Sequence, residues 1–197
     1  MTSTAPLGVV FLATSSDGHL AEEDGSVAFL DEFNETLPDG GGFFAFLGSV
    51  QAMVMGRKTF DTVLGFPGEV WPYGELPVWV ITTGENGEVQ IPQWLDAKGT
   101  VKVTTVSSGG LPGLLSALQK KVPGVARVYV DGGATVRAFL EAGLVSEATI
   151  TAVPLSLGRG IPCPLLEERH RPRLTQLGEA LRFDNGCVQT KYRIARP

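Results

Sequence analysis

Cysteine and histidine are scarce in this chain of 197 residues. Its two cysteines, Cys163 and Cys187, stand far apart and form no Cys-x-x-Cys pattern, which excludes the common zinc and redox motifs. Two histidines, His19 and His170, are too few for a histidine-rich metal site and leave little material for a Ser-His-Asp triad. We therefore expect no metal ion. Isolated thiols without a disulfide framework favour a cytoplasmic protein.

Long hydrophobic runs and an excess of positive charge are also missing. No apolar stretch approaches the roughly 18 residues that a membrane-spanning helix needs, so we expect no membrane partner. The formal net charge of −5 argues against nucleic acid as the main partner. Apolar residues make up 43% of the chain, which is enough for a substantial core. We expect one domain that spans residues 1–197.

Short apolar runs rich in Val and Ile alternate with helix-like segments along the first 150 residues. Most of these runs are continuous, as in strands that are buried on both faces. The alternation indicates right-handed crossovers and a mainly parallel sheet. The expected strands are 7–13, 52–55, 78–82, 101–106, 125–130 and 148–153, and the expected helices are 43–50, 111–121 and 135–142.

The pattern changes after Val153, where several prolines interrupt the chain. Two strand-like segments, 180–183 and 186–194, flank an Asn-Gly pair at 185–186, which is a strong hairpin signal. The predicted fold class is therefore α/β, with a mostly parallel mixed sheet that ends in an antiparallel hairpin. The glycine- and proline-rich stretch 64–77 is predicted to be a long loop that borders a binding cleft.

Two glycine-bearing turns follow predicted strands. One is Asp-Gly-Gly-Ala-Thr at 131–135, and the other is Gly-Arg-Lys-Thr at 56–59. Glycine lets backbone N–H groups approach an anion, and a following helix adds its unpaired amides and the positive end of its dipole. Arg57 offers a planar fork and Lys58 a point charge, which suit the 2′-phosphate of NADP. Taken alone, the turn 56–59 favours solvated charges after a buried strand, and the turn 131–135 is equally weak evidence, because tight strand–helix turns commonly use glycine. Together they favour a dinucleotide.

These turns also resemble a known family. The segment 55–60 (Met-Gly-Arg-Lys-Thr-Phe) resembles the nucleotide-binding turn of dihydrofolate reductases. The segment 131–133 with Leu-Gly-Arg-Gly at 157–160 resembles their sister group, the riboflavin-biosynthesis (RibD) C-terminal reductase domain and its stand-alone relatives. Ser-Ser-Asp-Gly at 15–18 matches the Ser-x-Asp-Gly of that group. The resemblance implies a three-layer dihydrofolate-reductase-like fold with helices on both faces of the sheet.

The resemblance also implies NADPH as cofactor, a small-molecule substrate and a homodimer. It assigns the 2′-phosphate and pyrophosphate to the turn 56–59, the adenosine end to the end of strand 78–82, and the pyrophosphate and nicotinamide ribose to the turn 132–136. The implied cofactor-binding residues are Gly56, Arg57, Lys58, Thr59, Thr82, Thr83, Gly132, Gly133, Ala134, Thr135 and Val136.

Three carboxylates are candidates for the proton donor, with solvent as a fourth source. Asp17 lies in the Ser-x-Asp-Gly match. Asp131 matches an acidic position that faces substrate in riboflavin-type reductases, and it is equally consistent with a cap for the following helix. Asp39 is either a displaced counterpart of the pterin-binding acid of dihydrofolate reductases or an ordinary turn residue. Three glycines follow Asp39, so we expect the helix to begin after them.

The preferred hypothesis is hydride transfer from NADPH to a small heterocyclic substrate. The nearest named activity is reduction of the ribosylamino-pyrimidine intermediate of riboflavin biosynthesis. One alternative is a dihydrofolate reductase, which requires Asp39 to lie in the cleft. The other is a non-catalytic NADP-binding protein on the same fold.

Overall fold

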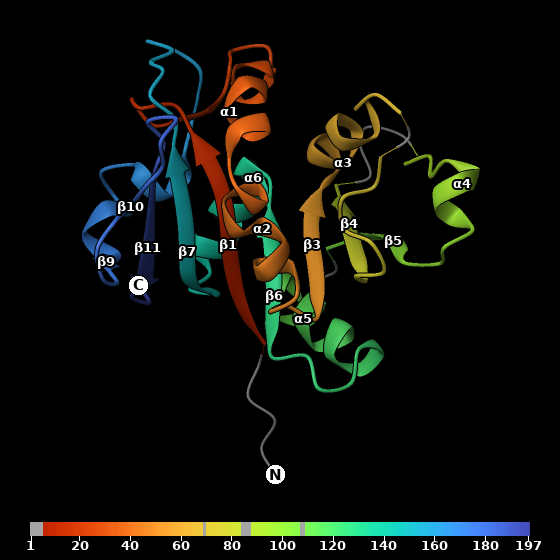
Figure 1. Cartoon of the computed structure of the whole chain (residues 1–197). Coiled ribbons are helices and arrows are strands. Elements are labelled where there is room, and N and C mark those ends of the chain that lie inside the picture. Colours follow the sequence, from red (N-terminus) through yellow and green to blue (C-terminus); the bar gives the residue numbers. More distant parts are fainter. Residues whose placement is uncertain (1–5, 69, 84–87, 107–108) are drawn as a thin grey trace.

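A mixed β-sheet forms the centre of the molecule (Figure 1). The computed structural model describes residues 6–68, 70–83, 88–106 and 109–197, and within them the sheet has nine strands in the order β10-β11-β7-β1-β6-β3-β4-β5, with β9 beside β11. The strands are β1 (Leu7–Thr14), β3 (Ala52–Gly56), β4 (Val78–Thr82), β5 (Val101–Thr105), β6 (Arg127–Asp131), β7 (Val145–Ala152), β9 (Leu174–Gln176), β10 (Leu181–Arg182) and β11 (Val188–Ile194).

Strands β7, β1, β6, β3, β4 and β5 run parallel to one another, whereas β11 is antiparallel to β7, β9 and β10. The predicted α/β class and the mostly parallel mixed sheet are therefore confirmed. All six predicted apolar runs form strands, within three residues of their expected starts. The parallel arrangement brings the carboxyl ends of six strands to one edge of the sheet, which we call the carboxyl edge.

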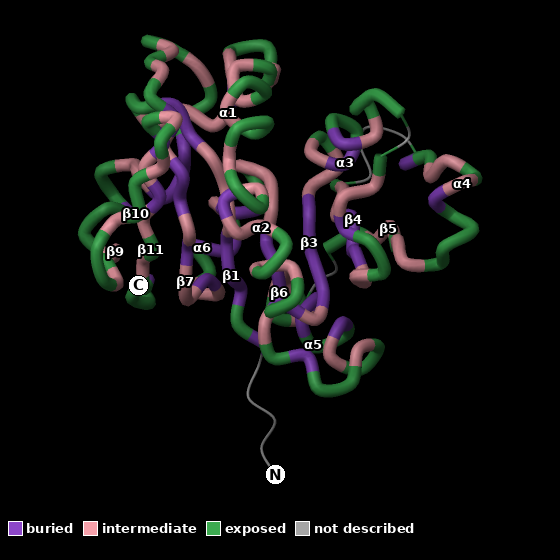
Figure 2. Tube along the Cα trace, in the orientation of Figure 1, coloured by how far each residue is buried: buried purple, intermediate pink, exposed green. Residues whose placement is uncertain are grey.

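Helices cover both faces of the sheet, as predicted. Helices α2 (Asp39–Leu47) and α3 (Arg57–Leu64) pack on one face, and α5 (Gly110–Lys121) and α6 (Gly133–Glu141) pack on the other (Figure 1). Each side has its own apolar cluster: Phe60 and Met55 belong to one, and Phe139 and Leu115 to the other. Buried residues run along the central strands between the two layers (Figure 2).

The start of α2 has an unusual backbone. Asp39, Gly40, Gly41 and Gly42 all have positive φ, from 50° to 84°, and regular helix follows only from Phe43. Glycine adopts this left-handed conformation without the steric cost that a side chain imposes. The expectation that the helix begins after the three glycines agrees with this geometry. Strand β11 holds the turn, because Gln189 Nε2 donates to the Gly41 carbonyl oxygen at 2.9 Å.

Glycine supports two chain reversals. Helix α6 ends at Glu141, and Gly143 follows with a φ of 67°, while Leu144 N–H donates to the Phe139 carbonyl at 2.9 Å. This is a Schellman stop with glycine in the left-handed position. The hairpin between β10 and β11 turns at 184–186, with Gly186 at a φ of 83°. Only glycine is left-handed there, so the turn is a three-residue loop rather than the tight two-residue Asn-Gly type.

The sequence did not indicate several short elements. The antiparallel pair β2–β8 lies next to the end of β1, and short helices stand before α2 and between β4 and β5. These elements are β2 (His19–Ala21), η1 (Ala28–Leu30), α1 (Asp31–Thr36), α4 (Gln93–Asp96), β8 (Ile161–Pro162), η2 (Pro164–Leu166) and η3 (Arg171–Arg173). In the described part of the chain, no helix combines the length and apolarity required to cross a bilayer.

Candidate functional site

The two glycine-bearing turns lie side by side at the carboxyl edge. Strands β3 and β6 are neighbours, and their register pairs Met55 with Asp131, the residues that immediately precede the two turns. Helix α3 begins at Arg57 and helix α6 at Gly133, so both helices start from adjacent points of the same edge (Figure 1). The arrangement required for one ligand to reach both turns is therefore present.

Each turn is packed against a threonine of the other. A Cβ atom at Gly132 would lie 2.2 Å from Thr59 Oγ1, and one at Gly56 would lie 2.8 Å from Thr135 Oγ1. Both distances are far below van der Waals contact, so glycine is required at both positions. Gly132 also has a φ of 90°, which other residues rarely adopt. This reciprocal packing adds to the pairing of β3 with β6, which places the two helix starts side by side.

The two helix N-termini offer hydrogen-bond donors at this edge. The residues that precede the helices, Gly56 and Gly132, carry no capping side chain. The first turns of α3 and α6 therefore present amide groups without intrahelical partners, together with the positive ends of two helix dipoles. Lys58 is exposed in the first turn of α3, and Arg57 Nε lies 3.3 Å from Asp61 Oδ2 one turn later. The local field favours an anion.

Asp131 lies at the end of β6 among aromatic side chains. Its Oδ1 accepts a hydrogen bond from the Gly132 N–H at 2.8 Å, and the cap position of α6 is occupied by Gly132 rather than by Asp131. Burial raises the pKa of Asp131 to about 6, against the lowering effects of the Gly132 amide and of Tyr129 and Tyr73. The carboxyl group therefore titrates near neutral pH, a property typical of functional sites.

Two tyrosines surround that carboxylate. The Tyr129 hydroxyl donates to the Phe11 carbonyl oxygen at 2.9 Å. A phenol has one proton, so Tyr73 is the phenol available as a donor to Asp131. Burial, followed by the negative charge of Asp131, raises the pKa of both tyrosines well above the usual value. Tyr73 comes from the predicted loop 64–77, which thus contributes a buried side chain next to the carboxyl edge.

Asp17 is held by five polar contacts in the turn after β1. Its oxygens accept hydrogen bonds from Ser15 Oγ (2.6 Å), Ser156 Oγ (2.9 Å) and the backbone amides of Leu157 (3.1 Å) and Gly158 (2.7 Å), and His19 Nδ1 lies 3.4 Å away. The Ser15 hydroxyl, followed by the backbone amides and Ser156, lowers the pKa of Asp17 strongly. The group stays ionised at neutral pH and fastens the loop after β7 to the end of β1.

The remaining predicted residues take different positions. Asp39 is exposed at the left-handed start of α2. Thr82 is partly buried at the end of β4, and Thr83 is exposed immediately after it. Ala134 is exposed in the first turn of α6, whereas Thr135 and Val136 are buried. A Cβ atom at Gly133 would lie 3.1 Å from Leu20 Cδ1, so strand β2 covers that side of the α6 start.

Two features of the site were missed from the sequence. Tyr73 could not be placed because the path of a long loop is set by tertiary packing. The Thr–Gly packing, in contrast, has a sequence signal: both turns read Gly-x-x-Thr, at 56–59 and at 132–135. The threonine stands in the first turn of its helix in both cases. This repeated spacing would have indicated that the two turns are built alike.

Comparison with known proteins is consistent with this geometry. Residues 6–188 match the model of the RibD C-terminal domain family. YwjB of Bacillus subtilis (strain 168), an uncharacterised protein, is 30% identical over 155 residues, which cover 78% of this chain and 80% of YwjB. A crystal structure of a Shewanella sp. PV-4 protein named for riboflavin biosynthesis is 30% identical, with a TM-score of 0.75, and the alignment covers 96% of this chain and 99% of that one.

Dihydrofolate reductase from Enterococcus faecalis, solved in complex with NADP(H), shares the fold. Its TM-score is 0.58 at 14% identity, and the alignment covers 96% of this chain and 95% of that one. The predicted superfamily is thus confirmed. The family match covers most of the sequence, and the similar structures include both a protein named for riboflavin biosynthesis and a dihydrofolate reductase. The chain belongs to the RibD C-terminal domain family.

Proposed function

We propose that this protein is an NADPH-dependent reductase of a small heterocyclic substrate. The observation that carries the proposal is the reciprocal packing of Thr59 on Gly132 and of Thr135 on Gly56. It brings two uncapped helix N-termini to one point of the carboxyl edge, where a pyrophosphate finds amide donors and two favourable dipoles. Ligands of open α/β sheets bind beyond this edge.

Each part of the cofactor has residues suited to it. The pyrophosphate fits the starts of α3 and α6, at Gly56 and at Gly132 to Val136. Arg57 and Lys58 are the cations for a 2′-phosphate, with Arg57 steered by Asp61 in the next turn. Thr82 and Thr83 end the adjacent strand and suit the adenosine end. When bound, NADPH would supply the hydride.

The protein must also provide or admit a proton, because reduction of a C=N or C=O bond adds a hydride and a proton. Asp17 is held ionised by its donors and is a poor acid at neutral pH. Asp39 is exposed at the start of α2. Asp131 lies directly before Gly132, and burial raises its pKa to about 6. Asp131 is therefore the proton donor we propose, with Tyr73 as the group that orients it.

The substrate we propose is a pyrimidine of the kind reduced in riboflavin biosynthesis. Support comes from the family match and from the Shewanella sp. PV-4 relative, which is named for that pathway. The dihydrofolate reductase alternative has less support, because it places Asp39 in the cleft and that residue is exposed. A non-catalytic NADP-binding protein would bind the cofactor and consume none in the presence of a pyrimidine or pteridine substrate.

Calorimetry with NADPH and NADH tests the cofactor assignment. Arg57→Ala should weaken NADPH binding by about tenfold or more and leave NADH binding nearly unchanged, because only NADPH carries the 2′-phosphate. Lys120→Ala is the matched control, since it removes an exposed positive charge at the far end of α5. Equal losses for both cofactors, or no heat with NADPH in the wild type, would refute the assignment. NADPH consumption with the ribosylamino-pyrimidine then separates an enzyme from a binding protein.

A further inference from the structure

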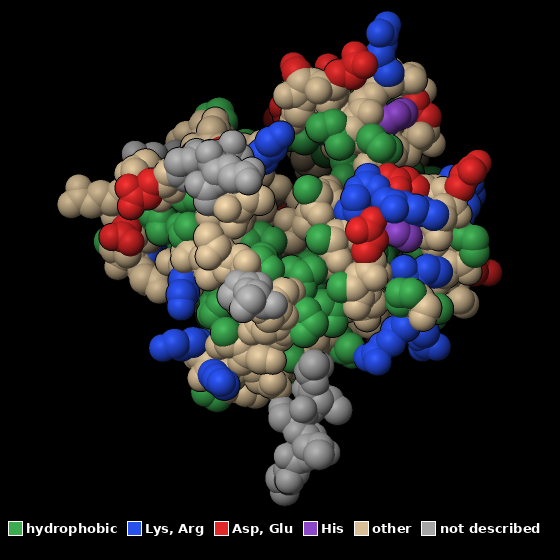
Figure 3. All heavy atoms as spheres, turned by 180° about the vertical axis from the view of Figure 1, so that it is seen from behind, with side chains coloured by type: hydrophobic (Ala, Val, Ile, Leu, Met, Phe, Trp, Pro, Cys, Tyr) green, Lys and Arg blue, Asp and Glu red, His purple; other side chains and the backbone are tan. Residues whose placement is uncertain are grey.

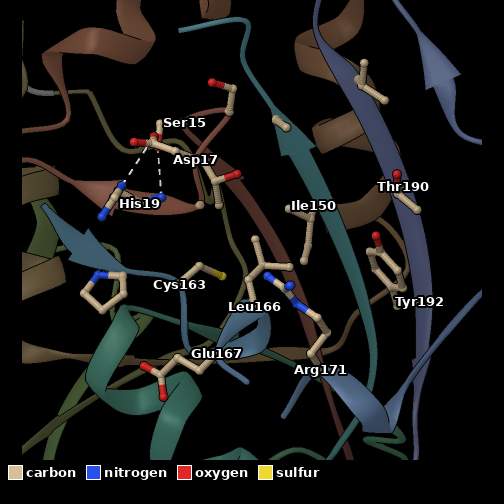
Figure 4. Close-up of a pocket in the computed structure, with 16 residues that line it drawn as sticks. Ser15, Asp17, His19, Ile150, Cys163, Leu166, Glu167, Arg171, Thr190 and Tyr192 are labelled. Carbon is tan, nitrogen blue, oxygen red and sulfur yellow. Dashed lines mark hydrogen bonds and ion pairs between the residues drawn. The ribbon is translucent and has the colours of Figure 1, made fainter. Parts of the chain in front are cut away.

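A cavity of about 420 Å³ lies beside the antiparallel part of the sheet (Figure 4). Its walls come from the end of β1 and the turn after it, from β7 and β11, and from the segment 162–171. None of its lining residues belongs to the turns 56–59 or 132–136. The cavity therefore shares no lining residue with the two turns at which we place NADPH.

Two polar atoms in this lining lack partners. Thr14 is fully buried at the end of β1, and its Oγ1 makes no hydrogen bond with any described residue. His19 Nδ1 is buried as well, and although Asp17 Oδ1 lies 3.4 Å away, the two atoms form no hydrogen bond. Buried polar groups are normally paired, and an unpaired one is costly. Both residues line the cavity, where a ligand can supply the missing partner.

The charges of the lining leave one cation uncompensated. Both oxygens of Asp17 accept hydrogen bonds. Glu167 pairs with Arg137 through both of its oxygens and with Arg169 at 3.1 Å. The Arg171 guanidinium forms no ion pair among the residues that the structure describes. Basic and acidic side chains gather together on the side of the molecule that carries β9–β11, on the right in Figure 3.

The opposite sides of the cavity differ in polarity. In Figure 4, Arg171 reaches from η3 toward Leu166, with Thr190 and Tyr192 of β11 nearby. No hydrogen bond of the Thr190 or Tyr192 hydroxyl is found within the described residues, so both are available to a ligand. Ile150, Leu166 and the buried Cys163 provide the apolar surface between Arg171 and the turn after β1.

We propose that this cavity binds a compact organic monocarboxylate with an apolar body. The carboxylate would pair with Arg171 and accept hydrogen bonds from Tyr192 and Thr190, and the apolar body would lie on Ile150 and Leu166. A dianion such as phosphate suits the cavity less well, because the ionised Asp17 and Glu167 stand in the same lining and Arg171 is the only uncompensated cation there among the described residues. A cationic ligand would be repelled by the positive charge of Arg171.

Benzoate and benzyl alcohol are the probes, since they share an apolar ring and differ in charge. Binding is followed by NMR chemical shifts of the 197-residue protein, without NADPH. We expect saturable benzoate binding with shifts at Ile150, Val188 and Thr190, and much weaker binding of benzyl alcohol. Arg171→Gln should weaken benzoate binding about tenfold and leave benzyl alcohol unaffected. Arg182→Gln, an exposed arginine of β10 outside the lining, should change neither.

A second variant keeps the test independent of Arg171. Tyr192→Phe removes one hydroxyl and should weaken benzoate binding by a smaller factor, without loss of the folded spectrum. Equal benzoate affinity in wild type, Arg171→Gln and Tyr192→Phe would overturn the proposal. So would shifts confined to the turns 56–59 and 132–136, or an absence of saturable binding at millimolar benzoate. Because NADPH is absent throughout, these outcomes do not depend on the reductase proposal.

Discussion

The two glycine turns and the cavity beside β11 are built differently. The turns are made of backbone: each Gly-x-x-Thr turn is four residues long and presents amide groups, and the two pack against each other through Gly132 and Gly56. The cavity is made of side chains from segments spread between Thr14 and Tyr192. A site made of backbone depends on a few glycines that tolerate no replacement. A site made of side chains spreads its energy over many positions, each of them replaceable.

The largest expected effect is at Gly132. In Gly132→Ala the new Cβ meets Thr59 Oγ1 at 2.2 Å and the backbone φ is 90°, so we expect the free energy of unfolding to fall by about 4 kcal/mol, with loss of NADPH binding. Urea unfolding and calorimetry measure the two effects.

Gly25→Ala is the control for backbone strain, because Gly25 has a φ of 91° and nothing within 4 Å of its Cβ position. Gly25→Ala should lower the free energy of unfolding by about 1 kcal/mol and leave NADPH binding intact. Adding Thr59→Ala to Gly132→Ala should recover part of the stability. If both glycine variants lose equal stability, the packing of Thr59 on Gly132 does not matter.

The next effect concerns the pH dependence set by Asp131. Burial raises its pKa from 3.8 to about 6, so the folded state holds this proton more tightly than the unfolded state. The tighter proton binding stabilises the folded state by roughly 3 kcal/mol. This contribution to the free energy of unfolding is fully present below about pH 4 and is lost as the pH rises through 6. Asp131→Asn should remove this loss, which urea unfolding at pH 4 and pH 7 measures.

Asp96→Asn, at an exposed carboxylate of α4, should leave the pH dependence of stability as it is in the wild type. If Asp131 is the proton donor, kcat/KM of the wild type should fall as the pH rises through 6. An unchanged stability slope in Asp131→Asn would show that the carboxyl group is solvated in solution.

The smallest effect is expected in the wall of the cavity. Glu167→Gln breaks a bidentate but partly exposed ion pair with Arg137 and should lower the free energy of unfolding by about 1 kcal/mol at pH 7. Arg137 lowers the pKa of Glu167, so this contribution is present above pH 4.5 and is lost as the pH falls through the lowered pKa.

NADPH affinity should not change in Glu167→Gln, because Glu167 lines the cavity and belongs to neither of the two glycine turns. Glu168→Gln is the matched control. Glu168 is the next residue in the chain, and its carboxylate is exposed and forms no ion pair among the described residues. Weaker NADPH binding in Glu167→Gln alone would show that the two sites are coupled.

Much of the architecture follows from local pattern. The runs of β3, β4 and β6 were predictable because strands buried on both faces need continuous apolar residues. Gly143 and Gly186 marked chain reversals because only glycine takes a positive φ there at little cost. The short elements β2, β8 and α4 were not predictable, since segments of two to four residues have no periodicity and form only against a finished core.

Sequence alone determined where this protein turns from strand to helix and which turns carry glycine, because those properties depend on the conformational freedom of single residues. The tertiary structure decided which turns meet and which side chains surround them. Asp131 lies beside Tyr73, Asp17 accepts hydrogen bonds from the loop after β7, and Asp39 is exposed on the surface. These outcomes depend on strand order and on packing between distant segments, and no local pattern encodes either.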